Sequence, residues 1–265
     1  MFIESFLMSC GRLQNRGCGL AWYASRFGAL RPQFKSEQPH IKMRLGILFS
    51  GGKDSAFASY LAKKEGNELI CLISIISKNP ESFMFHTPSI KEVEKQAKVI
   101  DLPILTKTTK GKKEEELKDL EEVIKKAKEK FKLEGIVTGA VASNYQASRI
   151  QKICDKLNLK CINPLWGIDQ IKLLKKLIKN KFKVIIVGVA AYPLDKSWLG
   201  KEINKDFIKD AKKMYEKYKI NPAGEGGEFE SFVLNCPLFK KGLKVIDKKI
   251  KGKDNSFSME IITRL

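Results

Sequence analysis

Residues 48–61 read LFSGGKDSAFASYL, and this stretch holds residue types that bind a phosphate group. Six consecutive positions carry them: Ser50, Gly51, Gly52, Lys53, Asp54 and Ser55. Paired glycines let main-chain N–H groups approach a ligand closely, the serines add hydroxyl donors, and the lysine adds a full positive charge. A helix that begins near the aspartate would add unpaired N–H groups and a partial positive charge. We therefore predict pyrophosphate binding here; a glycine turn followed by a helix cap at Ser50 or Asp54 is the simpler alternative.

A second stretch with chemical potential, residues 225–230, reads EGGEFE. It places three carboxylates within six residues, at Glu225, Glu228 and Glu230, and the glycines between them allow close backbone approach. Clustered carboxylates attract a cation, and repulsion between like charges raises the pKa of at least one of them, which suits proton transfer. A solvated acidic turn is the alternative for three glutamates considered in isolation.

The elements that must position these residues are read from apolar runs that alternate with helical patterns over residues 43–168. The predicted strands cover 44–49, 68–77, 102–107, 135–141 and 160–166, and the predicted helices cover 54–65, 89–100, 112–131 and 144–157. Strands that alternate with helices of this length pair in parallel through right-handed crossovers, so we predict an α/β fold with an open, doubly wound parallel sheet. Ligands bind beyond the carboxyl ends of the strands in such sheets, and the SGGKDS loop falls there.

The pattern changes near residue 168, where we place a domain boundary. The elements expected beyond it are a helix at 169–180, a strand at 183–190, a helix at 203–219, strands at 229–239, 243–251 and 256–265, and a hairpin turn at 252–255. We therefore predict a nucleotide-binding domain over 43–168 and a smaller α+β domain over 169–265.

Residues 1–42 differ in composition from the rest of the chain. Four of their six basic residues are arginine, whereas only Arg44, Arg149 and Arg264 are arginines among the 44 basic residues that follow. This arginine-rich, acid-poor stretch faintly resembles a transit peptide. We expect a non-native leader with little stable structure, and Met43 as the first residue of the working protein.

Composition limits the class of protein further. A net charge of +20 over 265 residues would suit a nucleic-acid or acidic-protein partner, but a lysine-coated surface is the simpler explanation, and the charge alone does not decide between them. Six cysteines occur without a CxxC pair, which indicates neither a zinc site nor a disulfide framework. The apolar runs are too short to cross a bilayer, so we predict a cytoplasmic protein without a membrane span.

Several stretches together resemble one family. The SGGKDS loop is similar to the loop with which PP-loop ATP pyrophosphatases grip the β- and γ-phosphates of ATP. The further stretches are, in order, MFHTPSI (84–90), GAVASNYQASRI (139–150), PLW (164–166), DKSWLG (195–200) and NPAGEGGEFES (221–231). With the loop they resemble the diphthine–ammonia ligase family of PP-loop, HUP-like enzymes, over residues 43 to about 240. Small departures from the family pattern occur at Ala147, Ser231 and Cys236.

The resemblance implies an ATP-dependent amidation. It implies that the protein joins ammonium to diphthine on translation elongation factor 2, giving diphthamide, AMP and pyrophosphate through an adenylated carboxylate. A carboxylate resists attack by ammonia because its leaving group is poor, and adenylation converts that group into AMP. ATP is then a substrate, Mg²⁺ the accompanying ion, and elongation factor 2 the protein partner. An RNA-modifying, tRNA-adenylating PP-loop enzyme is the alternative, which the positive charge would suit.

The resemblance also assigns the nucleotide-binding and catalytic residues. ATP would contact the six loop residues together with His86 and Gly139, with a loop histidine that has no role as the alternative for His86. Asp54 would hold Mg²⁺, with a helix cap as the alternative. Catalysis would fall on Lys53, Glu225 and Glu228, and we choose Glu228 as the residue that handles ammonium.

Further residues would contact the acceptor or the nucleotide. They are Ser143, Tyr145, Gln146, Arg149, Gly226, Gly227 and Glu230. Core packing is the alternative for Tyr145, and an ordinary surface ion pair is the alternative for Arg149.

Overall fold

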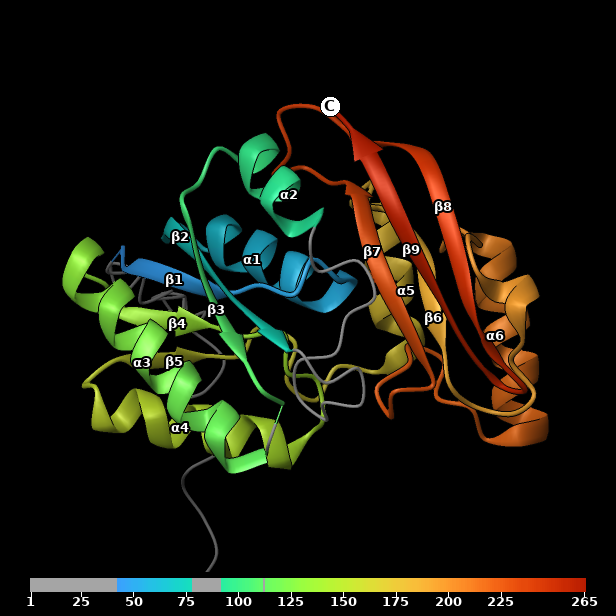
Figure 1. Ribbon diagram of the computed structural model, residues 1–265, viewed down its shortest axis with the longest axis horizontal. Coiled ribbons are helices and arrows are strands. Elements are labelled where there is room, and N and C mark those ends of the chain that lie inside the picture. Colours follow the sequence, from blue (N-terminus) through green and yellow to red (C-terminus); the bar gives the residue numbers. More distant parts are fainter. Residues whose placement is uncertain (1–41, 78–91, 112) are drawn as a thin grey trace, which may run out of the picture. The chain divides into compact units, whose positions relative to one another are not determined.

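A computed structural model of the chain describes residues 42–77, 92–111 and 113–265 (Figure 1). His86 lies outside the described residues, and so does the predicted leader apart from Lys42. Nothing in the structure therefore tests those two predictions.

The first half of the described chain forms a five-stranded parallel sheet. Its strands are β1 (Arg44–Leu48), β2 (Glu68–Ser77), β3 (Ile104–Thr109), β4 (Gly135–Val137) and β5 (Lys160–Ile162). They lie in the order β3-β2-β1-β4-β5, and every neighbouring pair is parallel. Because the chain moves one way from β1 to β3 and the other way from β4 to β5, the order reverses between β1 and β4. Ligands bind in such sheets at this switch point, beyond the carboxyl ends of the strands.

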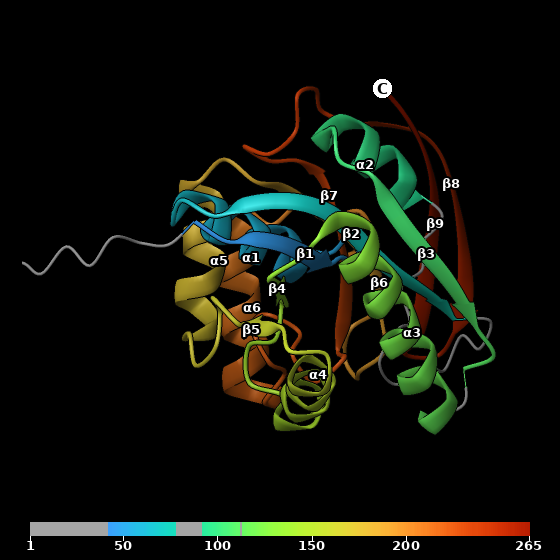
Figure 2. The same cartoon turned by 90° about the vertical axis from the view of Figure 1, so that its left-hand side faces the viewer.

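Helices cover both faces of this sheet (Figure 1 and Figure 2). They are α1 (Lys53–Lys64), α2 (Val93–Ile100), α3 (Lys113–Phe131) and α4 (Asn144–Lys156). Buried residues of α1 and α2 share one hydrophobic cluster with Leu45 and Ile47 of β1. Those of α3 and α4 share another with Ile73 of β2 and Ile136 of β4. The predicted fold class, a doubly wound α/β sheet followed by an α+β region, is confirmed.

Two strands of the parallel sheet are shorter than their apolar runs predicted. We expected strands over 135–141 and 160–166, whereas β4 ends at Val137 and β5 ends at Ile162. After β4, the side chain of Thr138 accepts the N–H of Ala140 at 3.2 Å and donates to Asn163 just beyond β5. The apolar residues that follow each strand therefore form loops at the carboxyl edge of the sheet.

The second half forms an antiparallel sheet with two helices. Its strands are β6 (Lys183–Val189), β7 (Phe229–Asn235), β8 (Lys244–Lys253) and β9 (Ser256–Arg264), and its helices are α5 (Gln170–Lys179) and α6 (Lys205–Tyr218) with a 3-10 turn at Lys196–Trp198. The strand order is β7-β6-β9-β8. We expected a strand over 229–239, whereas β7 ends at Asn235 and a turn follows it. The hairpin turn is only Asp254–Asn255, because Gly252 and Lys253 still pair with β9.

One hydrophobic cluster contains residues from both halves. Phe57 of α1 packs edge-on against Phe182 at 5.3 Å between ring centroids, and Leu173 of α5 and Val184 of β6 belong to the same cluster. The boundary near residue 168 falls in the segment between β5 and α5 and stays a prediction. Within the described ranges, no helix is both long and apolar enough to cross a membrane.

Candidate functional site

The SGGKDS loop joins β1 to α1 at the switch point. Gly51 has a φ of +81°, a left-handed conformation that favours glycine. Gly52 is the N-cap of α1 and makes no side-chain cap hydrogen bond, so the loop is not the simple cap by Ser50 or Asp54 that was the alternative. The Ser55 hydroxyl lies 3.2 Å from the Ser50 hydroxyl and 3.3 Å from the Ser50 N–H. Main-chain donors and hydroxyls thus gather at the start of the helix, which suits an anion.

Lys53 brings a buried positive charge to this loop. Only 3% of its surface is exposed, and its Nζ lies 2.7 Å from Asp54 Oδ2. Burial alone would lower the pKa of Lys53, but nearby carboxylates, chiefly Asp54, outweigh it and raise the pKa above its ordinary value. The other oxygen of Asp54, Oδ1, is buried and has no hydrogen-bond partner among the described residues. Lys53 is therefore charged, and Asp54 keeps one oxygen available for a further ligand.

The acidic stretch lies beside this lysine. Burial, and then the charge of Asp54, raises the pKa of Glu225 to about 7. Burial also raises the pKa of Glu230 to about 7, against the opposing effect of Lys53. Both carboxyl groups therefore change protonation near neutral pH, as a group that accepts and returns a proton must do.

Glu228 is engaged differently from the other two glutamates. Its Oε1 accepts the N–H of Asn221 at 3.0 Å, and its Oε2 accepts the N–H of Gly226 at 2.8 Å. The main-chain oxygen of Glu228 accepts the N–H of Ala190 at the end of β6. These contacts give Glu228 the role of holding the 221–228 loop in shape. Its predicted role with ammonium stays a prediction.

Hydrogen bonds join the SGGKDS loop to strand β7, which contains Glu230 at the end of the acidic stretch. The N–H of Lys53 donates to the Ser231 hydroxyl at 3.2 Å, and the N–H of Val233 donates to the Gly51 carbonyl at 3.0 Å. Ser231 is one of the departures from the family pattern, and the threonine usual there would offer the same hydroxyl oxygen. Strand β7 therefore holds the acidic residues against the SGGKDS loop.

Gly139, which follows β4, packs against the start of α1. A Cβ at this position would lie 2.7 Å from the main-chain nitrogen of Ser55 and 2.9 Å from the carbonyl carbon of Asp54. Backbone cannot move aside as a flexible side chain can, so only glycine fits. Further along the same loop, the main chain of Ala142 forms a hydrogen bond with the carboxylate of Glu225.

The residues assigned to the acceptor lie on two segments. Ser143 caps α4, since its hydroxyl accepts the N–H of Gln146 at 3.3 Å. The guanidinium of Arg149 stacks on the ring of Tyr145 at 3.5 Å from the ring centroid, so the two side chains form one unit. Ser143 directly follows Ala142, and so the start of α4 adjoins Glu225. The glycines at 226 and 227 are exposed parts of the acidic loop.

Sequence reasoning missed Gln96, a fully buried side chain of α2 that contacts the SGGKDS loop. The available signal was a polar residue three positions after Val93, on the apolar face of the helix.

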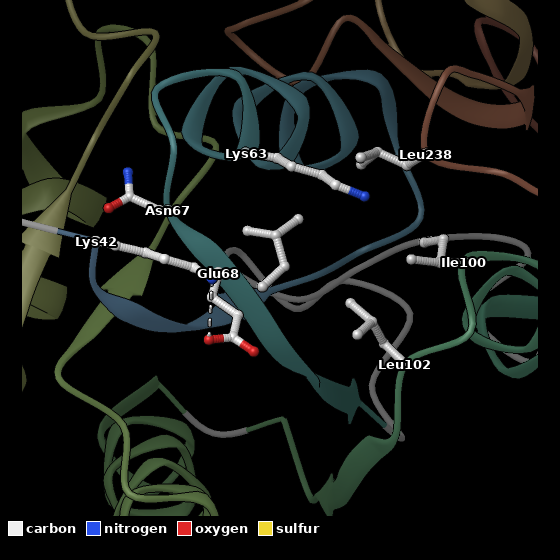
Figure 3. Close-up of a pocket in the computed structure, with 8 residues that line it drawn as sticks. Lys42, Lys63, Asn67, Glu68, Ile100, Leu102 and Leu238 are labelled. Carbon is white, nitrogen blue, oxygen red and sulfur yellow. Dashed lines mark ion pairs between the residues drawn. The ribbon is translucent and has the colours of Figure 1, made fainter. Parts of the chain in front are cut away.

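A cavity of about 270 Å³, lined partly by Lys42, Lys63 and Glu68, lies at the amino ends of β1 and β2 (Figure 3). None of the predicted site residues lines it.

Comparison with known proteins identifies the family. Residues 43–161 match the diphthamide synthase N-terminal domain, and residues 169–263 match the diphthamide synthase C-terminal domain. A Mus musculus protein named diphthine–ammonia ligase is 34% identical over 224 residues, covering 77% of this chain and 83% of its own. A Homo sapiens protein of the same name is 32% identical over 229 residues, covering 78% and 85%.

A solved structure is also similar. It is described as the predicted subunit of a tRNA methyltransferase from Methanocaldococcus jannaschii, and the match has a TM-score of 0.40 and 22% identity over 74% of this chain and 98% of that one. The domain matches cover most of the described chain, and the named relatives exceed 30% identity over most of their length. The chain therefore belongs to the diphthamide synthase family, whose curated members are named diphthine–ammonia ligases.

Proposed function

We propose that this protein is a diphthine–ammonia ligase, which uses ATP to amidate diphthine on elongation factor 2. The observation that carries the proposal is that strand β7, which contains Glu230 of the acidic stretch, binds the SGGKDS loop through its Ser231 and Val233. One loop suits a triphosphate and the other suits proton transfer, and adenylation followed by amidation needs both. The tRNA-adenylating alternative is not favoured, because both halves of the chain match diphthamide synthase domains.

The loop would hold ATP with its innermost phosphorus open to the acceptor. Main-chain N–H groups at the start of α1 and the Ser50 and Ser55 hydroxyls donate to phosphate oxygens, and Lys53 offsets their charge. Mg²⁺ takes few protein ligands and completes its shell with phosphate oxygens and water, so the unpartnered Asp54 Oδ1 fits it. Bound there, the ion would neutralise charge that builds on the phosphates.

The first step is adenylation of the carboxylate. An oxygen of the diphthine carboxylate attacks the α-phosphorus of ATP, and the bond to the bridging oxygen breaks as pyrophosphate leaves. The product is a mixed anhydride whose leaving group is AMP. Lys53 stabilises the transferring phosphates because its charge is already buried beside them and needs no reorganisation.

The second step needs neutral ammonia, and the acidic stretch supplies the base. We propose Glu225, with Glu230 as its neighbour, as the group that takes one proton from ammonium, because the pKa of each is raised to about 7. Ammonia then attacks the acyl carbon, the C–O bond to AMP breaks, and the second proton passes from the adduct to solvent. Glu228 shapes the loop that presents Glu225.

The test is a reconstituted reaction. Purified protein is incubated with Mg²⁺, ATP, ammonium and elongation factor 2 that carries diphthine, and the products are analysed by chromatography and mass spectrometry. We expect AMP, pyrophosphate and conversion of the acid to the amide in equal amounts. Elongation factor 2 that already carries diphthamide is the matched control and should give no AMP. Formation of ADP, or of AMP only when tRNA is added, would refute the proposal. Because elongation factor 2 works in the compartment of translation, we propose the cytoplasm as the site of action.

A further inference from the structure

Gln96 is a buried polar side chain that none of the sequence motifs contains. It lies on α2 with no surface exposed. Its amide nitrogen Nε2 donates two hydrogen bonds, one to the Gly51 carbonyl at 3.0 Å and one to the Val233 carbonyl at 2.8 Å. One side chain thus ties helix α2 to the SGGKDS loop and to strand β7.

The bond to Gly51 fixes the direction of a whole peptide unit. The Gly51 carbonyl accepts from Gln96 Nε2 and also from the N–H of Val233, so two donors hold it toward α2 and β7. The peptide between Gly51 and Gly52 is trans, and in a trans peptide the N–H points opposite to the carbonyl. The N–H of Gly52 must therefore point away from α2 and β7. Its contact in the loop is a long one, 3.4 Å to the Ser50 hydroxyl.

We propose that Gln96 is a positioning residue for nucleotide binding: it locks the Gly51–Gly52 peptide so that the Gly52 N–H is presented to a phosphate of ATP. The inference rests on the proposed function, since it takes the SGGKDS loop as the phosphate site. Without Gln96, only the N–H of Val233 would hold the Gly51 carbonyl, and the flexible glycine pair would more often turn this oxygen toward the phosphate. Fixing the peptide in advance removes the conformational entropy that would otherwise be lost when the ligand binds.

Glutamine suits this task better than residues of similar size. Nε2 carries two hydrogens, and both are used on carbonyl oxygens. Glutamate would aim acceptor oxygens at those carbonyls, and methionine would fill the space without donating. The fit is close, because a Cβ on Gly51 would lie 2.5 Å from Gln96 Oε1.

The competing explanation is that Gln96 only stabilises the fold. The same part of the chain provides a control for it, because Glu92, just before α2, accepts the hydroxyl and the N–H of Thr263 in β9. This contact is also buried and also joins the α2 region to the second sheet. It touches no residue of the SGGKDS loop.

The experiment compares Gln96→Met with Thr263→Val, using calorimetric binding of Mg²⁺–ATP, the KM for ATP, kcat and the melting temperature. We expect Gln96→Met to weaken ATP binding about tenfold and to raise KM more than it lowers kcat, since a preorganised hydrogen bond is lost. Thr263→Val should lower the melting temperature and leave ATP affinity within about twofold of the wild type. Equal ATP affinity in Gln96→Met and wild type would overturn the inference. Absence of ATP binding in the wild type would instead refute the proposed function.

A second measurement needs no variant and covers the case in which Gln96→Met does not fold. In isotope-labelled wild-type protein, the amide resonance of Gly52 should shift on saturation with Mg²⁺–ATP, and its hydrogen exchange should slow. The amide of Gly66, at the far end of α1, serves as the control and should change little. An unchanged Gly52 amide in the ATP-saturated protein would contradict the proposal.

Discussion

Two glycine-containing loops meet at the site, and they differ in the contacts that hold them. The SGGKDS loop is held by groups from outside it, since Gln96, Val233 and Ser231 fix its main chain. The EGGEFE stretch is shaped largely by one of its own side chains, Glu228, which accepts two N–H groups of the same loop. The first loop thus presents main-chain donors, and the second presents carboxyl groups.

The difference suits the chemistry that we propose for each loop. A phosphate carries a fixed charge, so a rigid set of N–H donors can be arranged for it in advance. A proton acceptor must change its own charge, which only a titratable side chain can do. Lys53 belongs to both regions, because its main-chain N–H contacts Ser231 and its ammonium group faces Asp54 and the glutamates.

Replacing Lys53 should impair both loops at once and give the largest loss of activity. In Lys53→Met the phosphates lose a buried cation, and Asp54 and the glutamates lose the charge that balances them. We expect kcat/KM for AMP formation to fall about 1,000-fold, as for loss of a preorganised charged group. Lys63→Met, at an exposed position on the same helix, is the control and should stay near wild-type activity. Retention of a tenth or more of the activity in Lys53→Met would contradict the role given to this lysine.

Gly139→Ala should disturb the SGGKDS loop and leave the acidic stretch in place. The added methyl group would lie 2.7 Å from the Ser55 nitrogen, so the start of α1 must move. We expect a loss of about 2–3 kcal/mol in the free energy of unfolding, measured with urea, and ATP binding weaker by roughly 100-fold. Gly242→Ala is the matched control, because the three atoms nearest to its methyl group would belong to Asn235 and lie 3.4 Å or more away. Wild-type ATP affinity in Gly139→Ala would show that the helix start does not bind phosphate.

The two regions also differ in how far the sequence could predict them. The alternation of strands and helices is a local pattern, and so are the loop after β1 and its place at the edge of the sheet. The ends of β4 and β5 were placed too late, and just beyond them Thr138 forms a hydrogen bond with Asn163, 25 residues away. A single sequence does not show such a pair.

The roles of individual side chains were harder to predict than the loops. The contacts of Gln96 join residues 45 and 137 positions apart, and no local motif encodes them. The three glutamates look alike in sequence, yet only the fold brings Ala142 to Glu225 and Asn221 to Glu228. The sequence therefore singled out the acidic region, but it could not assign a separate role to each of the three glutamates.

Glu225→Gln and Glu228→Gln separate the acid–base role from the shaping role. The first should lower kcat/KM about 100-fold and remove the rise in activity as pH increases through about 7, since no carboxylate is left to take the proton. The second should lower activity about tenfold or less and keep that rise, because the loop loosens while the base remains. The measurement is a profile of kcat/KM from pH 5.5 to 9 at saturating ammonium. The opposite assignment, with the pH dependence lost only in Glu228→Gln, would return the role to Glu228.

The smallest expected effect is on stability, and its sign follows from the raised pKa values. In the unfolded chain Glu225 and Glu230 titrate near the ordinary value of about 4.3, and in the folded protein they titrate at about 7. Between these values the folded state binds more protons than the unfolded state, so the free energy of unfolding falls as pH rises through this window. After a discount for partial exposure we expect a loss of about 1 kcal/mol between pH 5 and pH 8, measured by urea unfolding. Glu230→Gln should reduce this loss, whereas Glu129→Gln on the exposed face of α3 should not, because the effect comes from half-buried carboxylates beside the SGGKDS loop. A free energy of unfolding that rises over the same window in the wild type, and equally in Glu230→Gln, would mean that the acidic loop is solvated and does not hold a proton near neutral pH.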